Sequence, residues 1–399
     1  MPATAFVAAK RLRAGVRRHP WVYADSVTKT EGSYEPGDAV VVRAPDGKFL
    51  AHGFINDGSK LRLRLVSFER KRPIDDELLR ERIRDAVALR HEVLQLPERA
   101  NAYRLFHSEG DGLPGLIVDR YDEVLVLSVS ALGTFQRLEP ILDELETLLS
   151  PRAIVERGVS EGLRAREGLP AGRGVLRGEL PSDALQLTID GTRFELGLAA
   201  EGGQKTGMFL DQRENVRRVA ELARARRVLD ACCYLGAFGV ACARAGAERV
   251  ECFDVSEEAA AGARRTAELN EVSDRVEVRQ ASLYPELRRL ADAKQLFDLI
   301  VLDPPKFAPT ARDVKRASKG YLDANLMALK LLAPGGLLLT CSCSGHVDSE
   351  RFEGTLRRAA TRGSADLRVL ERWGAGPDHP VDVHCPEGRY LKAFLLQRR

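Results

Sequence analysis

The sequence lacks a long apolar run. No part of the 399 residues approaches the ~18 consecutive apolar residues that a membrane span requires. The first twenty residues also lack the order of a secretory signal, because a few apolar residues precede a basic cluster instead of following it. Hydrophobic residues make up 44% and charged residues 30% of the chain, which is typical of a globular protein in water. We therefore expect a cytoplasmic protein of roughly two or three domains.

The cysteines do not form the patterns that are typical of disulfide frameworks or zinc sites. The chain has seven cysteines, an odd number. Cys232, Cys233, Cys242 and Cys252 fall within one short stretch, but no two of them form a C-x-x-C pair. We predict neither a disulfide scaffold nor a bound metal.

Net charge is also small, at +3, but it is distributed unevenly. Residues 1–73 contain 14 Lys and Arg against 7 Asp and Glu, whereas the other 326 residues carry a net charge of −4. A basic module joined to a mildly acidic body favours binding to a polyanion such as a nucleic acid. A general excess of Arg over Lys is the alternative explanation, but it does not produce this asymmetry.

Turn signals and apolar periodicity divide the chain into three predicted domains. Residues 1–73 contain short apolar runs between turns, which predicts a small β barrel or sandwich. Residues 74–181 begin with a helical spacing over 74–96 and continue as a compact α+β domain. Its predicted strands are 116–118, 124–127 and 153–155, and its predicted helix is 138–149.

Residues 182–399 begin with a hairpin over 185–198 that turns at Asp190-Gly191. Strands and helices then alternate, which predicts a doubly wound α/β domain with a parallel sheet. A ligand binds such a domain beyond the carboxyl ends of its strands. The predicted strands are 227–231, 250–254, 276–279, 297–302, 336–340 and 389–396. The predicted helices are 237–245, 257–270, 286–291, 312–332 and 349–362.

The loop after the first of these strands contains Gly236 and Gly239, which allow close approach of a ligand to the backbone. It has no complete G-x-G-x-x-G. Asp254 ends the second strand, where a carboxylate can accept both hydroxyls of a ribose. These features fit NAD and S-adenosylmethionine equally well. A tight turn with a helix-capping Asp is the structural alternative.

The fourth strand ends in Asp303, followed by Pro304, Pro305, Lys306 and Phe307. Two prolines stiffen the backbone and present the aspartate to a flat polar edge. A nucleobase methyltransferase needs such an element, whereas a hydride-transfer enzyme does not. A proline-rich loop with a capping aspartate is the alternative.

Cys341 and Cys343 follow the fifth strand, two residues apart and therefore on one strand face. Carbon-5 of a pyrimidine attacks a sulfonium methyl group only after a thiolate has added to carbon-6. Most cysteines are structural, and we assign that role to the remaining five. Cys343, which lies in a loop beside Asp303, is our candidate nucleophile.

Together these motifs resemble the RlmI-like class of S-adenosylmethionine-dependent ribosomal RNA large-subunit cytosine-5 methyltransferases over nearly the whole chain. The segments that carry the resemblance are 18–22, 37–38, 109–121, 204–213, 303–307, 342–344, 378–380 and 386–390. The resemblance implies an N-terminal PUA domain that binds RNA, a central α+β domain and a Rossmann-like methyltransferase domain.

The resemblance also implies a set of binding residues. For S-adenosylmethionine they are Asp230, Gly236, Phe238, Gly239, Asp254, Ser256, Ser282, Lys205, Thr206, Asp211, Gln212 and Arg213. The acidic residue that the family usually places near the adenine has no match here, so Ser282 or backbone groups must serve. For the RNA they are Pro304, Pro305, Lys306, Phe307, Arg11, Arg17 and Arg18. Trp21 and Tyr23 either stack on a base or belong to the core.

Three functions are therefore in competition. In the first, Cys343 attacks carbon-6 of a cytosine in large-subunit rRNA and Asp303 binds the N3/amino edge. The second is methylation of a base amino group, which needs no thiol. The third is an inactive rRNA-binding assembly factor. The sequence leaves open which nucleotide is modified and whether the chain forms a homodimer.

Overall fold

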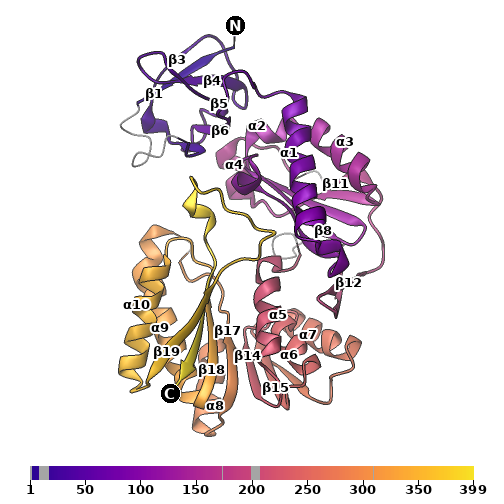
Figure 1. The fold of residues 1–399 in the computed structure, drawn as a ribbon, viewed down its shortest axis with the longest axis vertical. Helices are drawn as coiled ribbons and strands as arrows, with labels where there is room; N and C mark the ends of the chain where they lie inside the picture. Colours follow the sequence, from indigo (N-terminus) through magenta and orange to yellow (C-terminus); the bar gives the residue numbers. More distant parts are fainter. Residues whose placement is uncertain (1, 9–17, 173, 199–206, 309) are drawn as a thin grey trace. The chain divides into compact units, whose positions relative to one another are not determined.

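The computed structural model describes residues 2–8, 18–172, 174–198, 207–308 and 310–399 (Figure 1). Within these ranges, no helix is both long and apolar enough to cross a bilayer.

The chain divides into two compact units. The first comprises Met1–Leu185, Leu196–Met208 and Pro377–Gly388, and the second comprises Gln186–Glu195, Phe209–Gly376 and Arg389–Arg399. Two segments from late in the sequence thus return to the first unit, which local patterns did not predict. The division into domains 1–73, 74–181 and 182–399 stays a prediction.

The N-terminal part of the first unit is a six-stranded sheet with the order β2-β6-β5-β4-β1-β3. Alternate residues of β4 are buried in its core, as the apolar alternation predicts. All six strands belong to one sheet, which agrees with the predicted small β barrel rather than with a sandwich of two sheets. The strands are β1 (Thr4–Val7), β2 (Trp21–Val22), β3 (Val27–Glu31), β4 (Ala39–Arg43), β5 (Phe49–Ile55) and β6 (Leu63–Ser67).

The central part combines a five-stranded sheet with helices. Asp75 begins α1 (Asp76–Ala88) by accepting a hydrogen bond from the Leu78 backbone N–H, and the apolar face of α1 packs on α3 (Leu138–Leu149). The helix continues as a π-helical turn over Leu89–Val93, so the predicted helix over 74–96 begins two residues later and ends three residues earlier than expected. The sheet has the order β11-β10-β9-β8-β7. Its strands are β7 (Ala102–His107), β8 (Leu116–Tyr121), β9 (Val124–Val129), β10 (Ala153–Glu156) and β11 (Gly174–Gly178), and the short helices are α2 (Leu132–Phe135) and α4 (Glu161–Glu167).

The second unit contains a seven-stranded sheet with the order β16-β15-β14-β17-β18-β20-β19 (Figure 1). Its strands are β14 (Arg227–Ala231), β15 (Arg249–Asp254), β16 (Val276–Gln280), β17 (Phe297–Leu302), β18 (Leu332–Ser342), β19 (Leu367–Trp373) and β20 (Lys392–Arg398). Its helices are α5 (Arg213–Glu221), α6 (Ala237–Arg244), α7 (Glu257–Leu269), α8 (Leu283–Asp292), α9 (Val314–Leu331) and α10 (Ser349–Arg362).

Helices cover both faces of this sheet. Leu229 packs in one core cluster with residues of α8, α9 and α10, whereas its neighbour Val228 packs in another with residues of α5, α6 and α7. Successive side chains of a strand point to opposite faces, so a strand buried on both sides must be apolar throughout. The predicted doubly wound α/β domain is confirmed.

Three features of this unit differ from the prediction, and one of them is the helix α5 over Arg213–Glu221, which was not predicted. The last strand, β20, runs antiparallel to both of its neighbours, whereas the alternation of strands and helices predicted a fully parallel sheet. The edge strand β19 was not predicted, because residues 368–372 are exposed and lack the apolar pattern of a buried strand. The hairpin of β12 (Leu185–Ile189) and β13 (Thr192–Leu196) turns at Asp190 and Gly191 as predicted, both with positive φ.

Candidate active site

The parallel strands β14, β15, β17 and β18 end at one edge of the seven-stranded sheet. Leu302 pairs with Thr340 in the register of β17 and β18, so Asp303 and Cys343 follow neighbouring strand ends. The Asp303 backbone N–H also approaches the Ala231 carbonyl oxygen at 3.4 Å. The fold thus gathers the predicted aspartates and the predicted nucleophile at the edge where doubly wound domains bind ligands.

The loop after β14 is tightly wound. Cys232, Tyr234 and Gly236 all have positive φ, at 65°, 50° and 75°. For the two residues that are not glycine, this conformation is strained and persists only where the surrounding structure holds it. A Cβ on Gly239 would lie 2.4 Å from the Cys252 sulfur, so this glycine is required for packing of α6 on β15. Backbone conformation and the packing of α6 on β15 therefore both fix this loop.

Three carboxylates stand at this edge: Asp230, Asp254 and Asp303. Asp230 is buried and accepts a hydrogen bond from the Gly239 backbone N–H at 2.9 Å. Burial, together with repulsion from Asp303 and Asp254, raises the pKa of Asp230 to about 7 despite that hydrogen bond. A cationic ligand would relieve this repulsion. S-Adenosylmethionine carries an ammonium and a sulfonium, so this set of carboxylates fits it, whereas the diphosphate of NAD would add to the negative charge.

Asp254 also orders the loops that follow β14 and β15. Its two oxygens accept hydrogen bonds from the backbone N–H groups of Tyr234 and Ser256, each at 3.0 Å. Ser256 in turn accepts a hydrogen bond from Ala259 and caps α7. A carboxylate oxygen has two lone pairs, so Asp254 keeps acceptor capacity for a ribose.

Gln212 holds Asp303. The Gln212 amide donates to Asp303 Oδ2 at 2.9 Å, and the Asn215 amide donates to Gln212 Oε1 at 2.6 Å. Gln212 and Asn215 are buried, so this chain of amides fixes the rotamer of the aspartate. Beside them, the Tyr390 hydroxyl donates to Asp211 at 2.7 Å.

The remaining predicted cofactor residues have varied surroundings. Arg213 is buried and lies 3.5 Å from Asp190 of the hairpin turn. Phe238 packs in a core cluster, and Ser282 is exposed at the start of α8. Lys205 and Thr206 lie outside the described residues. The cofactor roles of all these residues stay predictions.

The loop 303–307 combines rigid and exposed parts. Pro304 is buried, whereas Pro305 and Lys306 are exposed. The Phe307 ring packs on Tyr321 with ring centroids 4.7 Å apart, so it faces the core. Pro305 and Lys306 are therefore the side chains that the loop presents outward.

The two cysteines of β18 and its following loop differ in environment. Cys341 is fully buried in a core cluster, and burial is the largest cause that raises the pKa of its thiol well above the ordinary value. Cys343 is partly accessible. Ser344 beyond it is buried, accepts a hydrogen bond from the Ala308 backbone N–H and lies 2.9 Å from the Tyr321 hydroxyl. The loop that carries Cys343 is thus anchored on both sides.

Lys392 is a residue that the sequence analysis missed. Its side chain is buried at this edge, and its ammonium donates to the carbonyl oxygens of Ser344 and Tyr390, each at 2.7 Å. The signal was a single lysine inside the otherwise apolar segment 391–396.

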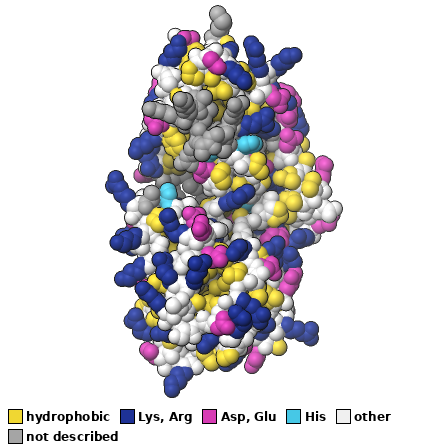
Figure 2. Space-filling model, turned by 60° about the vertical axis from the view of Figure 1, so that its left-hand side comes forward, with side chains coloured by type: hydrophobic (Ala, Val, Ile, Leu, Met, Phe, Trp, Pro, Cys, Tyr) yellow, Lys and Arg dark blue, Asp and Glu magenta, His cyan; other side chains and the backbone are white. Residues whose placement is uncertain are grey.

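Of the predicted RNA contacts outside the loop 303–307, Arg18 is a described residue of the first unit. Arg18 is exposed, and its guanidinium lies 5.8 Å from the centroid of the Phe68 ring. The Trp21 indole donates to Glu109 at 2.7 Å, so this ring is tied to the central part. Arg11 and Arg17 lie outside the described residues. Figure 2 shows Lys and Arg side chains at many places on one face, with Asp and Glu among them.

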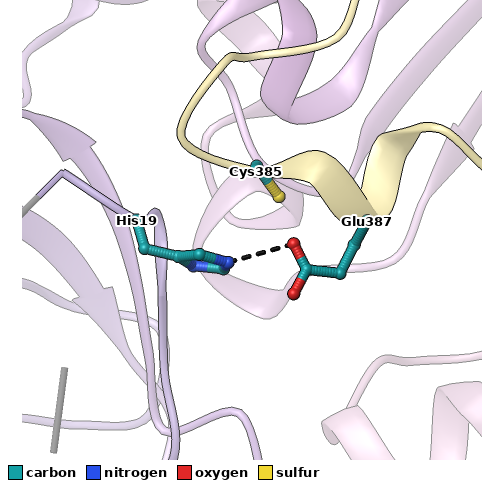
Figure 3. Close-up of side chains that lie close together, drawn as sticks. All are labelled: His19, Cys385 and Glu387. Atoms are coloured by element: carbon teal, nitrogen blue, oxygen red, sulfur yellow. Dashed lines mark hydrogen bonds and ion pairs between the residues drawn. The ribbon is translucent and has the colours of Figure 1, made fainter. Parts of the chain in front are cut away.

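A separate cluster in the first unit joins His19, Cys385 and Glu387 (Figure 3). His19 Nδ1 accepts a hydrogen bond from the Trp21 backbone N–H, so its Nε2 carries the proton and donates to Glu387 at 3.1 Å. A metal at Nε2 would need the opposite tautomer, with Nδ1 as the donor. Burial also raises the pKa of the Cys385 thiol, which disfavours the thiolate that metals bind. The cluster is a hydrogen-bonded tie between the first strands and segment Pro377–Gly388.

Comparison with known proteins gives matches across the whole chain. A family model of S-adenosylmethionine-dependent methyltransferases matches residues 103–397, and a model of PUA-like domains matches residues 7–68. The protein "Ribosomal RNA large subunit methyltransferase I" of Shewanella amazonensis is 38% identical over 382 residues, which cover 96% of each chain. The protein of the same name from Vibrio vulnificus (strain YJ016) is 35% identical over 400 residues, which cover all of both chains.

Solved structures share the fold. The structure of SMU.776 in complex with SAH has a TM-score of 0.84 and 18% identity, and the match covers 99% of both chains. The matches and the acidic sheet edge lead to one conclusion: this chain belongs to the S-adenosylmethionine-dependent methyltransferase family, with S-adenosylmethionine as its cofactor and a PUA-like domain at its N-terminus.

Proposed function

We propose that this enzyme methylates carbon-5 of a cytosine in large-subunit rRNA through a covalent adduct with Cys343. The observation that carries the proposal is the placement of Cys343 and Asp303 at the ends of the paired strands β18 and β17. The names of its relatives, which describe methyltransferases of the ribosomal RNA large subunit, support the choice of RNA.

The chemistry of the base explains the need for a thiol. Cys343 Sγ would form a bond with carbon-6, and the electron pair of the 5,6 double bond would become available at carbon-5. S-Adenosylmethionine supplies the methyl group as an electrophile. Loss of the carbon-5 proton to a base then returns an electron pair to the 5,6 bond, and the bond between Sγ and carbon-6 breaks to release the thiolate.

Asp303 would bind the polar edge of the cytosine. Its carboxylate can accept a hydrogen bond from the amino group and from N3 when N3 is protonated. Protonation of N3 makes carbon-6 more electrophilic, and a carboxylate fixed beside N3 would stabilise the protonated base. The amides of Gln212 and Asn215 orient the carboxylate before the substrate arrives.

Methylation of a base amino group is the second candidate. In enzymes of that kind an aromatic residue usually follows the two prolines, but here Lys306 occupies this position. Phe307 packs on Tyr321, so its ring is engaged with the core. This arrangement favours the thiol-dependent reaction.

Product analysis tests the proposal. We expect mass spectrometry of nucleosides from methylated rRNA to give 5-methylcytidine. The variant Cys343→Ala should lose turnover, whereas Cys341→Ala, a matched change two residues away, should keep it. Amino-methylated bases, or turnover by Cys343→Ala, would contradict the proposal. RNA binding without any methyl transfer by the intact protein would instead establish an assembly factor.

A further inference from the structure

Lys392 is a buried lysine within an apolar strand, and the residue is 4% exposed. It pairs with Ser342 in the antiparallel register of β18 and β20. Side chains that oppose each other across such a pair lie on the same face. The Lys392 side chain therefore starts beside the last residue of β18 and extends to the loop that contains Cys343.

The ammonium is held in place by backbone. The carbonyl oxygens of Ser344 and Tyr390 each accept one of its hydrogen bonds at 2.7 Å. An ammonium has three N–H donors, so two carbonyls do not exhaust it. Ser344, one of the two accepting residues, directly follows Cys343. The ammonium is thus held next to the loop that contains Cys343.

Burial of this charge needs compensation. Burial is the largest effect on Lys392 and lowers its pKa to about 8, and repulsion from Lys306 acts in the same direction. Cys343 and Asp348 act in the opposite direction and favour the ammonium. The charged groups that face Lys392 thus come from the loop after β17, the loop after β18 and the start of α10. At pH 7 the ammonium remains the main form.

We propose that Lys392 is a positioning residue whose fixed ammonium stabilises the thiolate of Cys343. The inference rests on the proposed function, in which Cys343 is the nucleophile. It explains why a lysine occupies a strand position that the fold would fill with an apolar side chain. An opposite charge within about 4–6 Å commonly shifts a pKa by about 1–3 units, which is enough to bring a thiol into the physiological range.

The alternative is that Lys392 only ties two carbonyls together, and the variants separate the two roles. Lys392→Gln keeps N–H donors but removes the charge, whereas Lys392→Arg keeps the charge. The measurement is the rate at which iodoacetamide alkylates Cys343, followed by peptide mass spectrometry from pH 5.5 to 9.5 without RNA or cofactor. Circular dichroism reports whether each variant is folded.

We expect the alkylation midpoint of the unmodified protein to lie below the ordinary thiol value of about 8.5. Lys392→Gln should raise that midpoint and slow alkylation at pH 7 by about tenfold, and Lys392→Arg should keep the original midpoint. An unchanged midpoint in folded Lys392→Gln overturns the inference, as does an original midpoint at or above about 8.5. If Lys392→Gln does not fold, the midpoint of the unmodified protein decides. A different result, methylation of rRNA by the variant Cys343→Ala, would contradict the proposed function itself.

Discussion

Charged groups are buried in both units, but they are compensated in different ways. In the first unit, Arg90 is fully buried and makes five hydrogen bonds. Two go to the carboxylate of Asp111, and three go to the carbonyl oxygens of Ala86, Arg104 and Asp378. The five N–H donors of the guanidinium are thus all used.

In the second unit, three carboxylates gather at one edge of the sheet, and that of Asp230 is buried. Neutral amides donate hydrogen bonds to Asp230, Asp254 and Asp303: the backbone N–H groups of Gly239, Tyr234 and Ser256 and the side chain of Gln212. Mutual repulsion adds to burial and raises the pKa of Asp230 to about 7.

We interpret the Arg90 network as a structural site and the three carboxylates of the second unit as a binding site. A network in which every donor has an acceptor holds two segments together and has nothing to offer a ligand. A cluster of like charges is unfavourable alone and becomes favourable when a cation binds. Removing one partner should therefore damage stability in the first unit and binding or turnover in the second.

The largest expected effect is the loss of the Arg90 network. Arg90→Met leaves Asp111 buried without its counter-charge, and we expect the free energy of unfolding to fall by about 3–5 kcal/mol. Urea denaturation measures this change. Arg152 and Glu123 form an exposed pair, with side chains 51% and 46% exposed, and Arg152→Ala is the matched control. That control should cost less than about 1 kcal/mol; equal losses in both variants would remove the contrast.

Asp303→Asn should act on turnover instead. The variant keeps the shape of the side chain but removes its charge, so we expect kcat to fall by about 100- to 1,000-fold. Stability and affinity for S-adenosylmethionine should change little, and calorimetric titration checks the affinity. A variant with near-normal kcat would remove Asp303 from the mechanism.

Asp254→Ala should weaken cofactor binding. The substitution removes the predicted ribose acceptor and the partner of the Tyr234 and Ser256 backbone groups, so we expect about a tenfold loss of affinity. Titration with S-adenosylmethionine measures it, and NAD should bind neither protein. Unchanged affinity would place the ribose elsewhere.

The pH dependence of cofactor binding tests Asp230. Because its pKa in the free protein is about 7, a cationic ligand that prefers the carboxylate must displace a proton below pH 7. Affinity should therefore rise as pH increases towards 7, by up to about tenfold per unit, and level off above it. Stability of the free protein should change in the opposite sense, falling between about pH 4 and 7, because the unfolded chain loses this proton first. Asp230→Asn should flatten both profiles; a persistent slope in that variant would assign it to another group.

The smallest expected effect concerns Arg18. Its exposed side chain would contact phosphate, so Arg18→Glu should weaken RNA binding a few-fold and reduce its salt slope by about one. Cofactor affinity should not change. Filter binding over a range of salt concentrations measures the slope, and an unchanged slope would remove Arg18 from the RNA surface. A point substitution is preferable to removal of residues 1–73, because the hydrogen bond between Trp21 and Glu109 joins this part to the rest of its unit.

Local sequence patterns predicted the helices and strands whose own residues have a clear apolar periodicity. β17 (Phe297–Leu302), α3 (Leu138–Leu149) and α10 (Ser349–Arg362) have the predicted bounds, because each has a mainly apolar run or a helical period. The direction of β20 was not predictable, since side-chain period is the same in parallel and antiparallel strands.

In the candidate site, too, local sequence patterns predicted single residues but not their tertiary contacts. Asp303 and Cys343 were found because each follows a strand of a recognisable sheet. The contact between Gln212 and Asp303 joins residues 91 positions apart, and that between Lys392 and Ser344 joins residues 48 apart. Such partners depend on tertiary packing, and no local period encodes them.

The central claim is that Cys343 forms a bond to carbon-6 of a cytosine, and a trapped complex tests it most directly. In rRNA that contains 5-fluorocytidine, fluorine replaces the proton that must leave carbon-5, so the adduct cannot be resolved after methyl transfer. We predict a denaturation-resistant protein–RNA complex that requires S-adenosylmethionine, maps to Cys343, forms with Cys341→Ala and is absent with Cys343→Ala. Methyl transfer to normal rRNA by the same preparation, without any trapped complex on the fluorinated RNA, would contradict the covalent mechanism.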